Sequence, residues 1–152
     1  MTPEERLARL GLVLPEVVTP LAAYVPAVRT GNYVYTSGQL PIVDGKLIAT
    51  GKLGAEVSDE QGIDLARICA LNAMAAIISV AGDLSHIVRI VKVLAFVAST
   101  PEYTNQPVVV DGASTLFGEV LGEAGRHARS AVGVAVLPRN APVELEVVAE
   151  VR

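Results

Sequence analysis

The stretch RSAVGVAVLPRNAPVELE, residues 129–146, decides the fold of this chain. Arg129 opens a segment rich in Val and Ala, a Leu-Pro turn follows, and a second segment alternates apolar residues with Glu144 and Glu146. Alternation with a period of two is typical of a half-buried strand. The stretch therefore predicts two strands, Ser130 to Leu137 and Val143 to Val151, joined by a Pro-containing turn.

Two long segments upstream carry helical signals. Ser58 and Gln61 form a capping box, and Gly82 suits the left-handed end of a helix, so a helix is predicted between them. Its buried stripe at helical spacing comprises Ile63, Ala66, Ala70, Ala73, Met74 and Ile77. A second helix is predicted from about Pro107 to Gly122 or Gly125, capped by Asn105 or Thr104. The Val- and Ile-rich segment between the helices, Ile87 to Ser99, predicts a long strand.

The N-terminal part predicts a short helix, a linker and three strands. Thr2-Pro3-Glu4-Glu5 is a capping box that starts a helix reaching about Gly11, and two prolines then keep the chain extended. Residues 1–20 thus form a helix and linker, and residues 21–152 form one domain. Within this domain, the first strands are expected at Ala22 to Val28, Asn32 to Ser37, and Ile42 to Thr50. The third is broken by an Asp-Gly turn.

This order of elements predicts an α+β fold with a mixed sheet and two long helices on one face. Apolar residues make up 51% of the chain and charged residues only 18%, which exceeds what one small core is expected to bury. Packing both helices on one face leaves the other free for partners, so a homo-oligomer is expected.

Composition also narrows the class of function. Acidic residues outnumber Lys plus Arg by 16 to 12, which disfavours nucleic acid as a partner. The lone Cys69 cannot form an internal disulfide, and this favours a cytoplasmic location. No uninterrupted apolar run reaches membrane-spanning length, and the charged N-terminus does not resemble a signal peptide. With only two histidines, a histidine-based metal site is not expected.

Arg129 is the first candidate site residue. A guanidinium is always charged and holds a carboxylate through two parallel hydrogen bonds. His127-Ala128 precede it and a nearly uncharged strand follows, so few local partners are expected to compete for it. We interpret it as a receptor for the carboxylate of a small acid; a surface arginine paired with a nearby acid is the alternative.

Four further residues are weaker candidates. Glu144 leaves the same face of its strand as Glu146, and that face is either solvated or the wall of a cleft. Burial would raise the pKa of Glu144 and suit it to acid/base work. Tyr24 is either a packing residue or a phenol directed into a pocket. Ser37-Gly38 ends a strand, where glycine serves a turn or lets a ligand approach the backbone.

Two segments resemble the Rid (reactive intermediate deaminase, or YjgF) family. YVPAVRTGNYVYTSGQLP, residues 24–41, is similar to the opening hairpin of that family, and RSAVGVAVLPRNAPVELEVVA, residues 129–149, to its closing signature. The resemblance implies a chorismate-mutase-like fold assembled as a trimer with clefts between subunits. It also implies hydrolysis of imines or enamines derived from amino acids, without metal or organic cofactor.

The same resemblance implies roles for individual residues. Arg129 corresponds to the arginine that grips the substrate carboxylate, Glu144 to the glutamate that places or activates water, and Tyr24 to the pocket tyrosine. Ser37 and Gly38 correspond to the small residues that line the cleft.

Two departures from the family pattern indicate a divergent branch. Ala131 stands where the best-studied members have a cysteine, so only its backbone could contact a substrate. Asp111 aligns with an asparagine of those members, and its charge could disfavour a second anionic group.

The sequence therefore favours a hydrolase resembling 2-iminobutanoate/2-iminopropanoate deaminase, with a small carboxylate-bearing metabolite as its ligand. The main alternative is a non-catalytic protein that binds such a metabolite for regulation, because gripping a carboxylate is not yet chemistry. An endoribonuclease or translation inhibitor fits the acidic balance less well. Chorismate mutase activity is disfavoured, because its dicarboxylate substrate is bound by several arginines, whereas this site has one assigned arginine and the nearby acidic Asp111.

Overall fold

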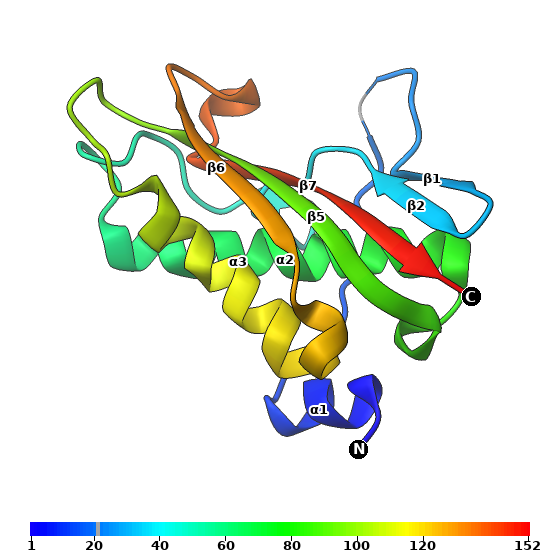
Figure 1. Cartoon of the computed structure of the whole chain (residues 1–152). Coiled ribbons are helices and arrows are strands. Elements are labelled where there is room, and N and C mark those ends of the chain that lie inside the picture. Colours follow the sequence, from blue (N-terminus) through cyan, green and yellow to red (C-terminus); the bar gives the residue numbers. More distant parts are fainter. Residues whose placement is uncertain (21) are drawn as a thin grey trace.

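The computed structural model describes residues 1–20 and 22–152 and contains a five-stranded sheet with two long helices across one face (Figure 1). Leu21, where the predicted main domain begins, lies outside the described residues. The strands are ordered β1-β2-β7-β5-β6. Their bounds are β1 Ala27–Thr30, β2 Tyr33–Thr36, β5 Ile87–Ala98, β6 Ala128–Val134 and β7 Val143–Val151. Strands β5 and β6 are parallel and the other neighbours antiparallel, which confirms the mixed sheet.

Helix α2, Asp59–Ala81, begins with the predicted capping box. Ser58 Oγ accepts from Gln61 N at 3.2 Å, and Ser58 N donates to Gln61 Oε1 at 2.9 Å. The helix ends at Gly82, whose φ of 98° is a conformation that favours glycine. By length and composition α2 could cross a membrane, but 56% of its most apolar stretch is buried within the protein, as in a core helix.

Helix α3, Gln106–Leu121, lies beside α2 on the same face of the sheet (Figure 1). The predicted placement of both helices on one face is therefore confirmed. Their buried sides meet the inward residues of the strands in one core, whose largest members are Phe117, Leu53, Met74, Ile77, Ile90, Leu116 and Leu145. The short helix α1, Pro3–Arg9, starts at the predicted Thr2 cap and packs Leu7 against α3.

Two predicted strand boundaries and one predicted helix cap are wrong for identifiable reasons. The first strand begins at Ala27 and not at Ala22, because Pro20 and Pro26 confine the chain before it to bends. The predicted strand over residues 42–50 shrinks to a two-stranded hairpin, β3 Ile42–Val43 and β4 Lys46–Leu47, around the Asp-Gly turn. Asn105 occupies the position before α3, but its side chain donates to Asp59 Oδ2 at 3.3 Å and makes no cap.

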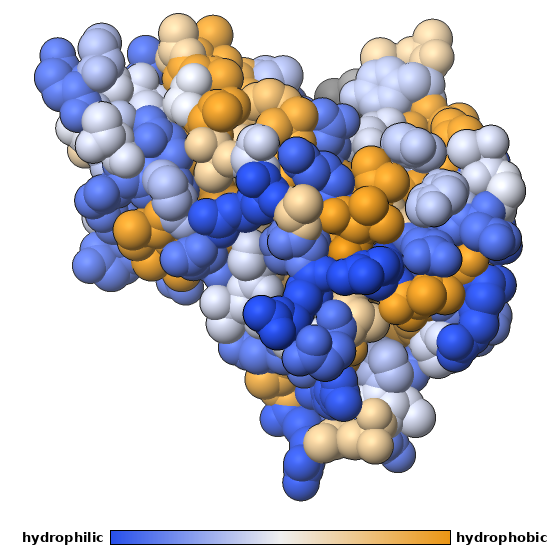
Figure 2. Space-filling view, viewed as in Figure 1, coloured by the Kyte–Doolittle hydropathy of each residue, from blue (hydrophilic) through white to orange (hydrophobic). Residues whose placement is uncertain are grey.

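The second face of the sheet carries no helix in the described chain. Along β7 the residues alternate between buried and half-buried, and Glu144 and Glu146 point to this open face. Large side chains exposed on the same face are Val28 (52%), Tyr33 (44%), Tyr35 (49%) and Val132 (41%). Figure 2, viewed as in Figure 1, shows apolar patches interrupted by charged side chains. Exposed apolar area of this kind is typical of a surface that meets a partner.

Candidate functional site

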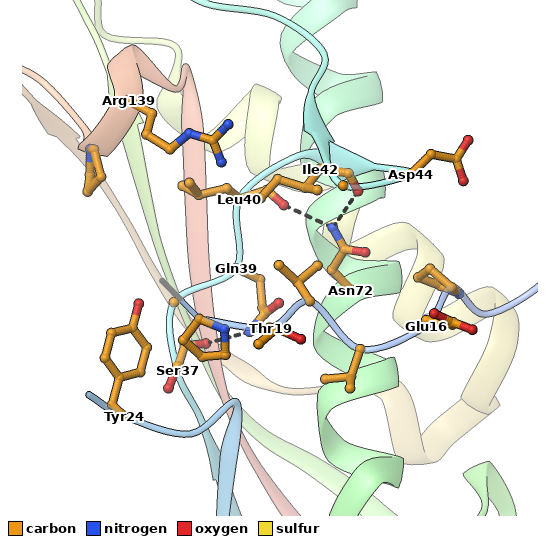
Figure 3. Close-up of a pocket in the computed structure, with 17 residues that line it drawn as sticks. Glu16, Thr19, Tyr24, Ser37, Gln39, Leu40, Ile42, Asp44, Asn72 and Arg139 are labelled. Carbon is orange, nitrogen blue, oxygen red and sulfur yellow. Dashed lines mark hydrogen bonds between the residues drawn. The ribbon is translucent and has the colours of Figure 1, made fainter. Parts of the chain in front are cut away.

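A cavity of about 810 Å³ lies between the linker after α1, the segment that follows β2, helix α2 and the turn before β7 (Figure 3). Its lining includes Tyr24, Ser37, Gly38, Gln39, Asn72 and Arg139. Three predicted site residues, Tyr24, Ser37 and Gly38, therefore come together in one cavity. A concave, largely apolar site with a few polar groups is the usual form of a small-molecule pocket.

Backbone pairing sets the position of the Ser37–Gln39 segment. Ser37 N donates to Pro26 O at 2.8 Å, which continues the hairpin of β1 and β2. Gln39 N donates to Leu145 O at 2.7 Å and Leu145 N donates back to Gln39 O at 3.1 Å. The segment is thus fixed beside the start of β7. As a result, Gly38 lies against Glu144.

The side chain of Glu144 occupies the space beside the Cα of Gly38. A Cβ there would overlap Glu144 Oε1 and approach Glu144 Cγ to 3.2 Å. The Glu144 side chain is half-buried, and this burial, with the Glu146 carboxylate close by, raises the pKa of Glu144 above its usual value. Glu144 therefore binds a proton more strongly than an ordinary surface carboxylate.

Tyr24 and Ser37 are the other two predicted site residues that line the cavity. Tyr24 is 56% exposed, and in Figure 3 its ring lies beside Ser37 at one side of the cavity. The Ser37 hydroxyl donates to Val25 O, one residue from Tyr24, which ties the tyrosine-bearing loop to the cavity wall. Tyr24 is therefore placed at the edge of the cavity, with its ring accessible.

Arg129 lies away from this cavity and is already paired. Its Nη1 donates to Asp111 Oδ1 at 2.8 Å and to Ser114 Oγ at 3.1 Å, and its Nη2 donates to Pro107 O at 3.3 Å. The expectation that few local partners compete for this guanidinium is wrong. Strand β6 lies next to α3, so an acid far away in sequence becomes an immediate neighbour.

Asp111, predicted as a ligand-contacting residue, thus neutralises part of the charge of Arg129. Its own side chain is 65% exposed while that of Arg129 is 21% exposed. An ion pair this close to solvent contributes little to stability and can be exchanged for another carboxylate at low cost. The guanidinium is held in position and remains able to change partners.

His127 helps to hold Ser114 in the position where it contacts Arg129. His127 Nδ1 lies 2.7 Å from Gly125 O, an acceptor only, so Nδ1 carries the proton and Nε2 accepts from the Ser114 hydroxyl at 2.9 Å. Burial lowers the pKa of His127, which favours this neutral form. Ser114 is then oriented to accept from Arg129.

The register places Arg129 and Glu144 on opposite faces of the sheet. Arg129 pairs with the buried, helix-facing Val93, whereas Glu144 pairs with Phe96 on the open face. Arg129 is also bonded to α3 on the helix side. These two residues therefore do not meet within one chain.

Ala131 turns its side chain toward the core. It pairs with the buried Ala95 and packs against the hydrophobic cluster. Its side chain is therefore not available to a substrate, and only the backbone of β6, an edge strand, could supply a contact.

Known proteins share both the sequence pattern and this geometry. The sequence profile of the YjgF/chorismate mutase-like family, whose description also carries an endoribonuclease label, matches residues 4–151. The chain belongs to this family. The match includes residues 4–9 of α1. The resemblance to Rid/YjgF proteins, deduced from residues 24–41 and 129–149, is confirmed.

Two curated proteins are similar to this chain over most of its length. Protein TCP17 of Trypanosoma cruzi is 44% identical over 145 residues, covering 95% of this chain and 91% of its own length. The 2-iminobutanoate/2-iminopropanoate deaminase of Dermatophagoides farinae is 31% identical over 133 residues, covering 87% of this chain and 88% of its own.

Solved structures of the family share the fold. Atu1372 of Agrobacterium tumefaciens, a protein of unknown function, is 46% identical with a TM-score of 0.92, covering 99% of this chain and 92% of its own. Escherichia coli TdcF with bound serine is 25% identical with a TM-score of 0.67, covering 90% of this chain and 94% of its own. The YjgF-like α+β fold is thereby confirmed.

Two residues of the cavity escaped prediction. Asn72 is the only polar residue in the helical stretch CALNAMAAII, and a lone amide in an apolar helix is a signal that could have found it. Arg139, in the turn between the last two strands, could not be distinguished by sequence from the arginines at other strand ends.

Proposed function

We propose that this protein hydrolyses reactive imines or enamines derived from amino acids to 2-oxo acids and ammonia, in clefts shared between subunits of a homotrimer. One observation carries the proposal: a half-buried carboxylate, Glu144, lies against Gly38, which lines a cavity together with Tyr24 and Ser37. The naming of a related protein as a 2-iminobutanoate/2-iminopropanoate deaminase supports this reaction class.

The opposite orientation of Arg129 and Glu144 supports a shared cleft. A site that uses both residues needs Glu144 of one subunit and Arg129 of another, since the two leave opposite faces of the sheet. Exposed apolar side chains on the open face, such as Tyr35 and Val132, are the kind of surface that a second copy would cover.

Each residue has a distinct task in the proposed reaction. Arg129 exchanges Asp111 for the substrate carboxylate and holds the imine in one orientation. Glu144, with its raised pKa, is a stronger base than an ordinary carboxylate and removes a proton from the attacking water. Tyr24 supplies a hydroxyl at the edge of the cavity for the water or the departing nitrogen.

The atoms balance without an added reactant. An enamine is first protonated on carbon to give the imine. Water then adds to the imine carbon, the nitrogen takes up the protons, and the carbon–nitrogen bond breaks as the carbonyl forms. The products are a 2-oxo acid and ammonia. Because no electrons are transferred to or from the substrate, this reaction requires no redox cofactor.

The test is ammonia release from 2-iminopropanoate, which an amino-acid oxidase generates in place. We expect the protein to accelerate hydrolysis over buffer and Arg129→Ala to lose the acceleration. Arg67→Ala is the matched control, because Arg67 forms a surface ion pair with Glu119 at 3.1 Å. Equal rates with and without folded protein would reject this substrate.

A regulatory protein that binds a small carboxylate is the second candidate. The Asp111–Arg129 ion pair favours it, because a guanidinium held by an exchangeable acid suits reversible capture of a carboxylate. The presence of serine in TdcF supports small-metabolite binding in the family. Saturable binding of a carboxylate with no ammonia release would select this candidate.

A further inference from the structure

We propose that the cavity lined by Tyr24, Asn72 and Arg139 binds an elongated small molecule with an acidic group at one end and an amine at the other. The inference concerns what the cavity holds and does not require imine chemistry or Arg129. It rests on the distribution of charge along the cavity, which Figure 3 shows from one end to the other.

Arg139 supplies the cationic end. It lies in the turn before β7, and in Figure 3 its guanidinium is on the same side of the cavity as Tyr24. Among residues 1–20 and 22–152, no carboxylate lies within ion-pair distance of Arg139 and no hydrogen bond engages its side chain. A guanidinium with no partner among the described residues is a receptor for a carboxylate.

The backbone turn that presents Arg139 is unusual and well anchored. Arg139 and Asn140 have φ values of 59° and 60°, in the left-handed region that non-glycine residues rarely adopt. Gly51 N donates to Asn140 O at 3.0 Å, and Ala141 N donates to Pro138 O at 3.1 Å. Residues held in such conformations are often positioned for function.

Asn72 supplies an acceptor in the wall of the cavity. Only 1% of this residue is exposed, and both hydrogens of its Nδ2 are used, by Leu40 O at 2.9 Å and Ile42 O at 3.0 Å. Its Oδ1 accepts from no group in the described chain, although Asn72 lines the cavity. Because this oxygen is accessible from the cavity, a donor group of a bound molecule can reach it.

Acidic side chains at the other end of the cavity favour a ligand whose hydrogen-bond donor is positively charged. Glu16, from the linker, and Asp44, from the β3–β4 turn, line the cavity on the side opposite Arg139 and Tyr24 (Figure 3). Asn72 lies between these acids and the arginine. An amine near Asn72 Oδ1 would satisfy the amide oxygen and experience both carboxylates, whereas a second carboxylate would be repelled.

Apolar residues separate the two ends. Leu40 and Ile42 lie in the wall between the two ends (Figure 3), so the middle of the ligand is expected to be a chain of methylene groups. The cavity thus selects for length as well as for charge.

Isothermal titration calorimetry with 8-aminooctanoate, octanoate and octylamine tests the inference. We expect 8-aminooctanoate to bind roughly tenfold or more tightly than either single-charge compound, because each end adds a charge-assisted hydrogen bond. Arg139→Gln should weaken octanoate and 8-aminooctanoate, whereas Glu16→Gln combined with Asp44→Asn should weaken octylamine and 8-aminooctanoate. Asn tolerates the φ of 51° at position 44, and Arg67→Gln is the control.

Two results would overturn the inference. One is the absence of saturable binding of all three compounds by folded wild-type protein. The other is binding that Arg139→Gln leaves unchanged, because the ligand would then lie elsewhere. Ammonia release from 2-iminopropanoate, measured on the same protein preparations, separates the two proposals, since binding of 8-aminooctanoate without acceleration of imine hydrolysis supports this inference and rejects that substrate.

Discussion

Glu144 Oε1 occupies the space that a Cβ at Gly38 would need, so the side chain of Glu144 lies directly against this glycine of the cavity wall. Gly38 is held in place by the pairing of Gln39 with Leu145, directly after Glu144 in β7. The glycine therefore does more than end a strand. It allows a carboxylate to lie flat against the backbone next to the candidate site.

Gly38→Ala should separate stability from activity. The atoms that a Cβ would meet belong to the flexible end of Glu144, so the side chain can move away and the fold should lose less than about 1 kcal/mol. Deaminase activity should fall at least roughly tenfold, because a displaced base no longer reaches the water. Denaturant unfolding and ammonia release measure the two effects. Full activity in this variant would mean that Glu144 has no positional role.

Glu144→Gln should abolish activity and stabilise the fold at neutral pH. The folded state raises the pKa of Glu144, so the contribution of this group to stability is present below its ordinary pKa of 4.5 and is lost as the pH rises through the folded value. Glutamine removes the buried charge. The stability difference between variant and wild type should therefore be largest near pH 7 and vanish in acid, where both side chains are neutral. A variant less stable than wild type at pH 7 would contradict the burial of this carboxylate.

Asp111→Asn should strengthen the capture of carboxylates. The substitution removes the charge that competes for Arg129 while keeping the size of the side chain, so KM for an imino acid or Kd for a carboxylate should decrease. Stability should fall by no more than about 1 kcal/mol, since the pair is partly exposed. Steady-state kinetics, with Glu119→Gln as the control for loss of a surface ion pair, measure the effect. An increased KM in Asp111→Asn would indicate that Asp111 itself contacts the substrate.

The sequence predicts those features that depend on neighbours along the chain. The Ser58–Gln61 cap, the end of α2 at Gly82 and the alternation of β7 are set by residues a few positions apart, and all three are confirmed. The family signature likewise lies in continuous segments. For this reason, the amino-acid sequence is sufficient to place Tyr24, Ser37 and Gly38 in one pocket.

Contacts between residues far apart in the chain could not be predicted from local sequence patterns. The Asp111–Arg129 pair forms because α3 packs beside β6, and no local pattern indicates that neighbour. The role of Asn72 follows from its hydrogen bonds to the carbonyls of Leu40 and Ile42, which lie in a different segment of the chain. Arg139 becomes distinct from other surface arginines only through the turn that directs it to the cavity.

Mixing two inactive variants tests the central claim most directly, that Arg129 and Glu144 act together from different subunits. Arg129→Ala and Glu144→Gln would each be assayed alone, and then after co-expression and isolation of oligomers that contain both. Each alone should be inactive, and the mixed oligomers should regain about one third of wild-type ammonia release. A trimer that contains both variants has three clefts, and one of them combines an intact Glu144 with an intact Arg129. Mixed oligomers without activity, beside an active wild type, would contradict the shared cleft.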